Sequence, residues 1–461
     1  MNIFQRICRL SFGDFEIDEF KKFCRMGAIF ALIIGVYWTL RPLKDSLFIQ
    51  LVDKFQLPYA KTVSVLLLLP LVMLYTRLLE KNSREKMLHL LPACYGAVIL
   101  LFAGLMQWAQ APQEVIAARS SLAFFGTKAL GYVWYVFVES FGSLVVALFW
   151  AFATDTTIPA SAKRGFPLVV ALGQIGGIIF PYSIAGLPHR LNHSTDTLSL
   201  ITLGFLTLLI IPLVRSFLQK TPASLMQAFH GNNEKEEASE QEPGFLEGFR
   251  LLTKHRYLLA IFAVNFIYEF IVTIFDFNFK IAAADTYSGV ALSHYLSLYG
   301  SSVNIVSLSC LLLGISNVTR FLGVGAALAA MPVIVGIALF GFLTIDSLTF
   351  LFGLMVGSKA INYALNGPAL KQLYIPTTTD VRFKAQAWIE TFGSRASKEA
   401  GSLFNMLLSP LQKLLGAQAG RSSYLMLSGG IGFVLLFGWL IFALYLGRSH
   451  RKAIEEKRVI C

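Results

Sequence analysis

The sequence is poor in charged residues and in cysteine. Only 14% of its 461 residues are Asp, Glu, Lys or Arg, whereas 55% are hydrophobic, and the mean hydropathy is +0.63. Soluble proteins of this size carry about 25% charged residues, so composition excludes that class and places the chain in a lipid bilayer. The five cysteines, at positions 8, 24, 94, 310 and 461, lack metal-ligand spacing, and we interpret them as unpaired thiols.

Motifs of common enzymes are also missing. The chain contains no G-x-x-x-x-G-K-[ST] phosphate loop and no H-E-x-x-H helix, so neither ATP hydrolysis nor zinc-protease chemistry is expected. His189 and His193 in "LPHRLNHST" stand four residues apart, but acidic companions are lacking and we expect a solvated loop. We therefore predict no enzymatic activity, no metal and no cofactor.

Long apolar runs recur along the whole chain. About 20 apolar residues are needed to cross the hydrocarbon core, and this criterion predicts an all-α membrane protein with about twelve transmembrane helices. The predicted spans are 24–49, 59–79, 87–108, 130–153, 166–185, 197–215, 257–281, 294–316, 323–344, 347–366, 386–411 and 424–446. The glycines of "LGQIGG" in the fifth span would let helices approach closely.

The basic residues are distributed unevenly between the predicted loops. Lys and Arg gather before the first span, between spans two and three, after span four and in the C-terminal tail, whereas the alternate loops carry few. By the positive-inside rule both termini face the cytoplasm. The acidic N-terminus fits neither a secretory signal nor a transit peptide, and we expect a multi-pass protein of the cell inner membrane.

A polar segment divides the chain into two halves. We predict a cytoplasmic N-terminal segment (1–23), a six-helix half (24–215), a cytoplasmic linker (216–256), a second six-helix half (257–446) and a cytoplasmic tail (447–461). The halves echo each other in "RPLKDSLF" and "FDFNFK", and in "ATDTTIPASAKRGF" and "IPTTTDVRFKAQAW". Two echoes at corresponding places indicate parallel six-span repeats, as in major facilitator transporters.

Charged residues interrupt the apolar runs of the first half. Arg41, Lys44 and Asp45 in "TLRPLKDSLFIQL" fall on one helix face. Either the span ends at Leu40 and Pro42 begins an external loop, or the helix continues and the charges line a water-filled cavity; the apolar run after Asp45 favours the cavity. Glu139 stands in mid-span and predicts an aqueous pathway, with protonation or a partner such as Arg41 or Lys44 as alternatives.

The second half carries a similar set. Glu269, Asp276 and Lys280 share one helix face with Asn265, which indicates either a pathway or a buried contact between helices. Lys359 is a further cation that could snorkel to the interface.

Arg395, Lys398 and Glu399 repeat the spacing of Arg41, Lys44 and Asp45, although a cytoplasmic helix end would explain them equally well. Fixed cations in both halves suggest an anionic substrate whose phosphates they hold, with the carboxylates balancing the empty site or carrying protons.

Three segments, "YWTLRPLKDSLF", "VESFGSLVVALFWAFATDTTIPASAKRGFPL" and "YIPTTTDVRFKAQAWIETFGSRASKEAGS", resemble the ATP/ADP translocase family of obligate intracellular bacteria and plastids. The resemblance implies a twelve-helix carrier, and it places functionally important charges at Lys44 (beside Arg41 and Asp45), Glu139 and Lys398. The corresponding second-half carboxylate falls on Glu269 when a gap is allowed, with Asp276 as the competitor. The family's Lys-Glu pair before "YIP" is replaced here by Leu370 and Lys371, as in divergent members.

The sequence thus predicts a nucleotide transporter that exchanges ATP for ADP by alternating access. Alternatives are proton-coupled import of a nucleotide, NAD or another organic phosphate, and a membrane scaffold without transport activity. Expected partners are ATP, ADP and the lipid bilayer, with no nucleic acid, and we expect a monomer. The predicted substrate-binding residues are Arg41, Lys44, Glu139, Glu269, Asp276, Lys280, Arg395 and Lys398.

Overall fold

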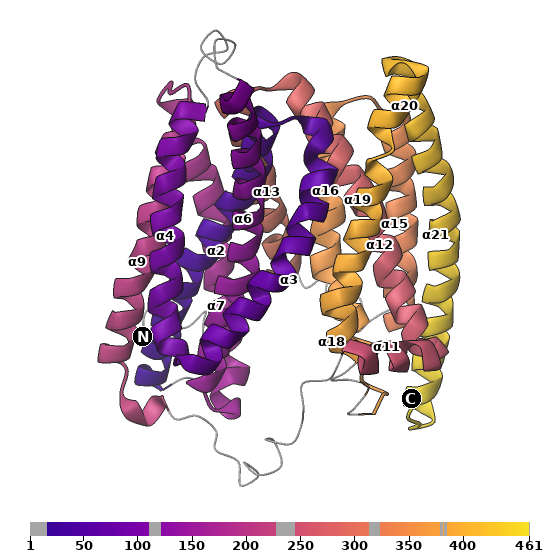
Figure 1. The fold of residues 1–461 in the computed structure, drawn as a ribbon. Helices are drawn as coiled ribbons and strands as arrows, with labels where there is room; N and C mark the ends of the chain where they lie inside the picture. The colour runs from indigo at the N-terminus through magenta and orange to yellow at the C-terminus, as the bar shows by residue number, and fades with distance from the viewer. Residues whose placement is uncertain are drawn as a thin grey trace. The chain divides into compact units, whose positions relative to one another are not determined.

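The computed structural model describes residues 16–109, 121–226, 245–312, 323–378, 381 and 385–460. Every regular element in these ranges is helical and none is a strand (Figure 1). The elements up to residue 220 are α2 (Ile17–Leu51), α3 (Leu57–Lys81), α4 (Arg84–Ala109), α6 (Ser121–Asp155), α7 (Pro159–Phe180), α8 (Leu187–Arg190) and α9 (Thr197–Lys220). Short 3₁₀ turns lie at Lys54–Gln56 and Ala223–Leu225.

The later elements include several short helices. They are α11 (Phe245–Lys254), α12 (Arg256–Thr286), α13 (Gly289–Leu312), α15 (Val324–Thr344), α16 (Leu348–Ile361), α17 (Gly367–Gln372), α18 (Gln386–Trp388), α19 (Ser394–Asn405), α20 (Leu408–Leu415) and α21 (Ala417–Glu455). π-helical turns continue α7 (Pro181–Ala185), join α16 to α17 (Asn362–Asn366) and join α18 to α19 (Ile389–Gly393).

The predicted all-α membrane fold is confirmed. Within the described ranges, nine helices are long and apolar enough to cross a membrane. The other three predicted spans also fall on helices: α13, the run from α16 to α17, and the run from α18 to α19. Residues 1–15 and 227–244, which include most of the predicted N-terminal segment and the centre of the predicted linker, lie outside the described residues.

The chain forms two compact units, whose boundary differs from the predicted halves in one segment. Unit 1 comprises residues 1–232 and 284–304, and unit 2 comprises residues 233–283 and 305–461. The end of α12 and most of α13 therefore pack in unit 1, although they follow the linker in sequence.

In unit 1, α2 packs against α6, α7 and α9. The contact with α7 depends on Gly176, because a Cβ at that position would lie 2.0 Å from the carbonyl oxygen of Ala31 on α2. The glycine run therefore permits the close helix approach that its sequence indicated. Aromatic rings fill the adjacent core, where Phe30 stacks on Phe149 with 4.7 Å between ring centroids.

In unit 2, α12 is buried along most of its length and α15 packs against α21. Phe275 on α12 lies 5.1 Å from Phe342 on α15, and Tyr268 lies 6.1 Å from Trp439 on α21, both measured between ring centroids. Each compact unit thus has its own apolar core. Each core also contains one long helix with charged residues, α2 in unit 1 and α12 in unit 2.

Candidate functional site

Helix α2 carries its charged residues through the membrane-spanning region. It runs without a break past Pro42 to Leu51, so the alternative in which the span ends at Leu40 is wrong. Proline is tolerated inside a membrane helix because neighbouring groups satisfy the carbonyl it leaves free. Lys44 and Asp45 are each 4% exposed, and the guanidinium of Arg41 lies 5.2 Å from the Trp38 ring centroid.

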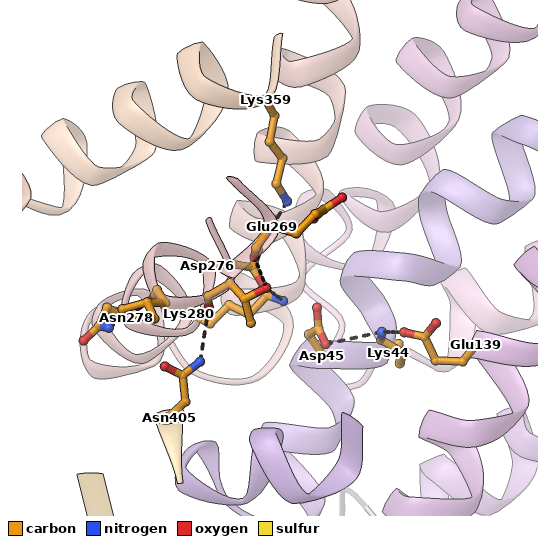
Figure 2. Close-up of polar contacts among 11 residues, drawn as sticks. Lys44, Asp45, Glu139, Glu269, Asp276, Asn278, Lys280, Lys359 and Asn405 are labelled. Atoms are coloured by element: carbon orange, nitrogen blue, oxygen red, sulfur yellow. Dashed lines mark hydrogen bonds and ion pairs between the residues drawn. The ribbon is translucent and has the colours of Figure 1, made fainter. Parts of the chain in front are cut away.

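Lys44 pairs with Glu139 on α6, one of the two partners that the sequence offered (Figure 2). The Lys44 ammonium also lies 3.7 Å from the Asp45 carboxylate and 4.2 Å from the Tyr135 ring centroid. The Glu139 side chain is 38% exposed, whereas that of Lys44 is 6% exposed. The carboxylate therefore stands between a buried cation and accessible space.

The surroundings on α6 explain this orientation. Trp134 and Phe141, which flank Glu139 in sequence, are fully buried in the apolar core. Ser140 is buried and shares a hydrogen bond of 2.7 Å with the Tyr95 hydroxyl on α4. Because successive residues of a helix point in different directions, α6 packs these side chains into the unit while Glu139 meets α2.

In unit 2, one carboxylate on α12 contacts two lysines. Asp276 accepts a hydrogen bond of 2.5 Å from Lys280, one turn later on α12, and lies 3.4 Å from the ammonium of Lys359 on α16 (Figure 2). Asp276 and Lys280 are each 8% exposed. The Lys359 side chain is 14% exposed and turned to Asp276, so the expectation that it could snorkel to the interface is wrong.

A second ion pair in unit 2 joins α12 to α19. The Lys398 ammonium lies 3.5 Å from the Glu269 carboxylate, which also accepts a hydrogen bond of 3.4 Å from Ser394. The Glu269 side chain is 20% exposed and that of Lys398 is 55% exposed. Arg395 is half-buried one turn before Lys398, and no ion pair among the described residues includes it.

Both lysines that contact α12 from other helices stand beside a π-helical turn. Lys359 precedes the turn Asn362–Asn366, and Lys398 follows the turn Ile389–Gly393. The extra residue in a π turn rotates the helix after it, and such turns are frequent at functional sites. The helical period of the sequence alone gives no sign of them.

Two further polar clusters were not predicted. In unit 2, Tyr424 on α21 donates to Asn405 on α19 (2.6 Å) and accepts from Asn278 on α12 (3.3 Å). In unit 1, the fully buried Asp196 accepts from Ser293. Their signal in the sequence is weak, because single Asn, Ser and Asp residues near helix ends are common.

Each unit thus contains one contact between a lysine and a glutamate, Lys44 with Glu139 in unit 1 and Lys398 with Glu269 in unit 2. The Lys44 cation is buried and needs an anionic partner, whereas Lys398 is half-exposed. Within the described ranges, no three His, Cys, Asp or Glu side chains gather as a metal ion would require.

Comparison with solved structures places the fold among membrane transporters. The crystal structure of the nucleoside transporter NupG matches with a TM-score of 0.64 at 13% identity, covering 91% of this chain and 98% of that one. A bacterial homologue of the iron transporter ferroportin in an inward-facing state matches with a TM-score of 0.59 at 11% identity, covering 92% and 100%. The predicted major-facilitator-like architecture is thereby confirmed.

Sequence comparison is more specific. The chain is 22% identical to ADP,ATP carrier protein 1 of Rickettsia typhi, over 96% of this chain and 95% of that protein. It is 23% identical to the plastidic ATP/ADP-transporter of Solanum tuberosum, over 93% and 73%. The family model of the TLC ATP/ADP transporters matches residues 6–450. The chain therefore belongs to the TLC ATP/ADP transporter family.

Proposed function

We propose that this protein exchanges ATP for ADP across a bacterial inner membrane by alternating access. Family membership and similarity to ADP,ATP carrier proteins along nearly the whole chain support this proposal. The observation that carries it is the pair of lysine–glutamate contacts, Lys44 with Glu139 and Lys398 with Glu269. Each provides a cation for a phosphate and a carboxylate that takes the cation back when the phosphate leaves.

The exchange of partners at Lys44 explains how a buried cation can serve a mobile substrate. Removing an ion from water costs several kcal/mol unless it is paired. In the empty carrier Glu139 supplies that pairing, and a polyphosphate replaces it while Glu139 turns to the accessible side, where it is already 38% exposed. Lys398 and Glu269 form the corresponding pair on α19 and α12, but there the lysine is the more exposed partner, so it can meet a phosphate without first being uncovered. Substrate binding therefore changes which groups form ion pairs. A ligand can shift the equilibrium between two conformations only if it interacts differently with each of them, and this change of ion pairs provides such a difference.

The remaining candidate residues take supporting roles in this proposal. Arg41 and Arg395 add positive charge beside the phosphate-binding lysines. Asp276 and Lys280 neutralise each other on α12 through their ion pair. The carrier works as a monomer, with both termini in the cytoplasm, as the concentration of Lys and Arg in the predicted cytoplasmic loops supports.

Uptake of radiolabelled ATP into intact bacterial cells that express the chain tests the proposal. An exchanger takes up ATP in the presence of a proton uncoupler and releases the label when unlabelled ADP is added outside. Lys44→Gln should abolish uptake, while membrane insertion, measured by the amount of protein in purified membranes, stays the same.

Other outcomes would select a different activity. Uptake that the uncoupler abolishes would replace exchange with proton-coupled import. If the cells took up NAD or another organic phosphate from a panel but no ATP, the proposed binding residues would stand and the transported substrate would be a different compound. Absence of transport for every compound, together with indifference to Lys44→Gln, would indicate a scaffold.

A further inference from the structure

The short helix α11 differs from the spans of unit 2 in its direction and in its surface. It lies crosswise to α12 and α21, at the same end of the unit as the C-terminus (Figure 1). Its Leu252 side chain is 2% exposed, whereas that of Phe249 is 46% exposed. Arg250 and Lys254, one turn apart, are exposed. A crosswise helix with apolar residues on one side and basic residues on the other is typical of the membrane interface.

Positive charge is concentrated where α11 meets α12. Arg250, Lys254 and Arg256 are exposed, and no ion pair between side chains that the structure describes includes any of them. Like charges one turn apart destabilise a helix. Arg256 is the first residue of α12, whose first turn contains no acidic residue, although the N-terminus of a helix favours negative charge. The three cations are therefore unfavourable for the protein alone and become favourable when an anion lies beside them.

The surroundings of α11 indicate which anion this is. In the proposed orientation the helix lies at the cytoplasmic leaflet, whose anionic lipids attract basic segments next to a membrane span. A guanidinium group binds a phosphate through two parallel hydrogen bonds. The exposed ring of Phe249 adds apolar surface, which acyl chains can cover and a soluble phosphate cannot. Cations beside an exposed aromatic ring therefore favour an anionic phospholipid.

The same ring connects α11 to a lysine of the candidate site. Phe249 lies 5.7 Å from Trp388 between ring centroids, and α11 packs against α18, which ends at Trp388. The π-helical turn Ile389–Gly393 joins α18 to α19 with helical backbone at both junctions, so the three form one continuous run. This run carries Lys398, whose ammonium lies 3.5 Å from Glu269. A lipid that holds α11 in place therefore also holds the helix that positions Lys398.

We propose that α11 binds anionic phospholipid headgroups of the cytoplasmic leaflet through Arg250, Lys254 and Arg256, and that this attachment speeds transport by holding the run from α18 to α19. The lipid site stands on the residues of α11 and on the proposed orientation, whereas its effect on transport rests on the proposed exchange function. Each cation near an anionic membrane surface strengthens binding about fivefold.

Fluorescence quenching tests the lipid site without any nucleotide. In a variant lacking the native cysteines, a fluorophore is attached to Thr253→Cys, an exposed position beside Lys254, and the protein is reconstituted in phosphatidylcholine vesicles. Brominated phosphatidylglycerol should quench the fluorophore at several-fold lower content than brominated phosphatidylcholine does, and high salt should reduce this preference. Arg250→Gln, Lys254→Gln and Arg256→Gln, combined in one triple variant, should remove it.

A second pair of cations provides the matched control for the quenching. Arg77 and Lys81 are also exposed and one turn apart, but they lie on α3 in unit 1. Arg77→Gln with Lys81→Gln should leave the preference at position 253 unchanged. Equal quenching by the two lipids in the protein with native α11 cations would overturn the lipid site. Loss of the preference on addition of inorganic phosphate at constant ionic strength would show a site for soluble anions, which also overturns it.

ATP/ADP exchange in vesicles tests the effect on transport. The native protein should exchange several-fold faster in an equal mixture of phosphatidylcholine and phosphatidylglycerol than in phosphatidylcholine alone, whereas the triple variant should show the slower rate in both. Phe249→Ala keeps the cations but removes the ring that contacts Trp388, so it should keep the quenching preference and lose the acceleration. Acceleration that persists in the triple variant would contradict the effect of α11 on transport. A quenching preference without exchange in any vesicle would retain the lipid site and contradict the proposed function.

Discussion

Lys359 on α16 places its ammonium 3.4 Å from the carboxylate of Asp276 on α12. In the predicted order of spans, this contact joins the first and fourth spans of the second half. The first and fourth spans of the first half are joined by Lys44 on α2 and Glu139 on α6, with the cation and the carboxylate exchanged. An ion pair between the corresponding helices is therefore present in each unit. Such a pair could stabilise the fold, bind the substrate or do both, and experiments must separate these two contributions.

A double-mutant cycle on Lys44 and Glu139 makes this separation. Removing one partner of a buried pair costs about 3–5 kcal/mol, and the partial exposure of Glu139 lowers our expectation to about 1–3 kcal/mol for Lys44→Gln. We expect a lower melting temperature of the purified protein and at least a tenfold loss of ATP uptake.

The double variant Lys44→Gln, Glu139→Gln is the decisive control. It removes both charges of the Lys44–Glu139 pair, so its melting temperature should lie above that of Lys44→Gln. It should not return fully to the native value, because Asp45 still loses its contact with Lys44. Uptake should nevertheless remain low, because the phosphate-binding cation is absent. Recovery of uptake together with stability would show that the pair only holds α2 and α6 together.

The contacts of Asp276 predict an unequal effect of its two partners. Asp276→Asn weakens both the Lys280 and the Lys359 ion pairs, whereas Lys359→Met removes one and retains the other. We expect Asp276→Asn to lower the melting temperature roughly twice as much as Lys359→Met, as the loss of two buried partners rather than one implies. Thermal unfolding of the two purified variants in the same detergent measures this. Equal shifts would mean that the Lys280 contact contributes nothing beyond that of Lys359.

Much of the fold could be predicted from the sequence, because the bilayer imposes a length and an apolar composition on each span. A different regularity predicted that the charges of α2 share one helix face and that those of α12 do too, because residues three or four apart in a helix lie on the same side. The partners could not all be predicted. Lys359 meets Asp276, and Lys398 meets Glu269, beside π-helical turns that leave no periodic signal. The packing of α13 in unit 1 depends on hydroxyl and amide contacts, such as those of Ser293 and Asn304, that hydropathy does not register.

Gly176 should be the position on α7 that least tolerates a side chain. A Cβ there would lie 2.0 Å from the backbone oxygen of Ala31, and backbone cannot move aside as a flexible side chain does. Gly176→Ala should therefore lower the melting temperature and the yield of folded protein. Gly104→Ala on α4 is the matched control, because nothing lies within 4 Å of its Cβ; it should be neutral or stabilising by up to about 1 kcal/mol through helix propensity. Equal behaviour of the two variants would contradict the close packing of α2 on α7.

Tyr424 on α21 should be required for the packing of α12, α19 and α21. Its hydroxyl donates to Asn405 at 2.6 Å and accepts from Asn278 at 3.3 Å, and all three side chains are buried. Tyr424→Phe keeps the ring, which lies 5.6 Å from that of Phe404, but leaves both amides without this partner.

The cost of an unsatisfied buried polar group is about 1–3 kcal/mol, so Tyr424→Phe should lower the melting temperature by several degrees. Tyr445→Phe on the same helix removes a hydroxyl from a side chain that is 42% exposed, and it should leave the melting temperature unchanged. If both substitutions were neutral, water would have to replace the Tyr424 hydroxyl between Asn405 and Asn278. Because the two amides belong to α19 and α12, the helices that carry Lys398 and Glu269, loss of the hydroxyl should also reduce ATP uptake, and restoring tyrosine at position 424 should restore it.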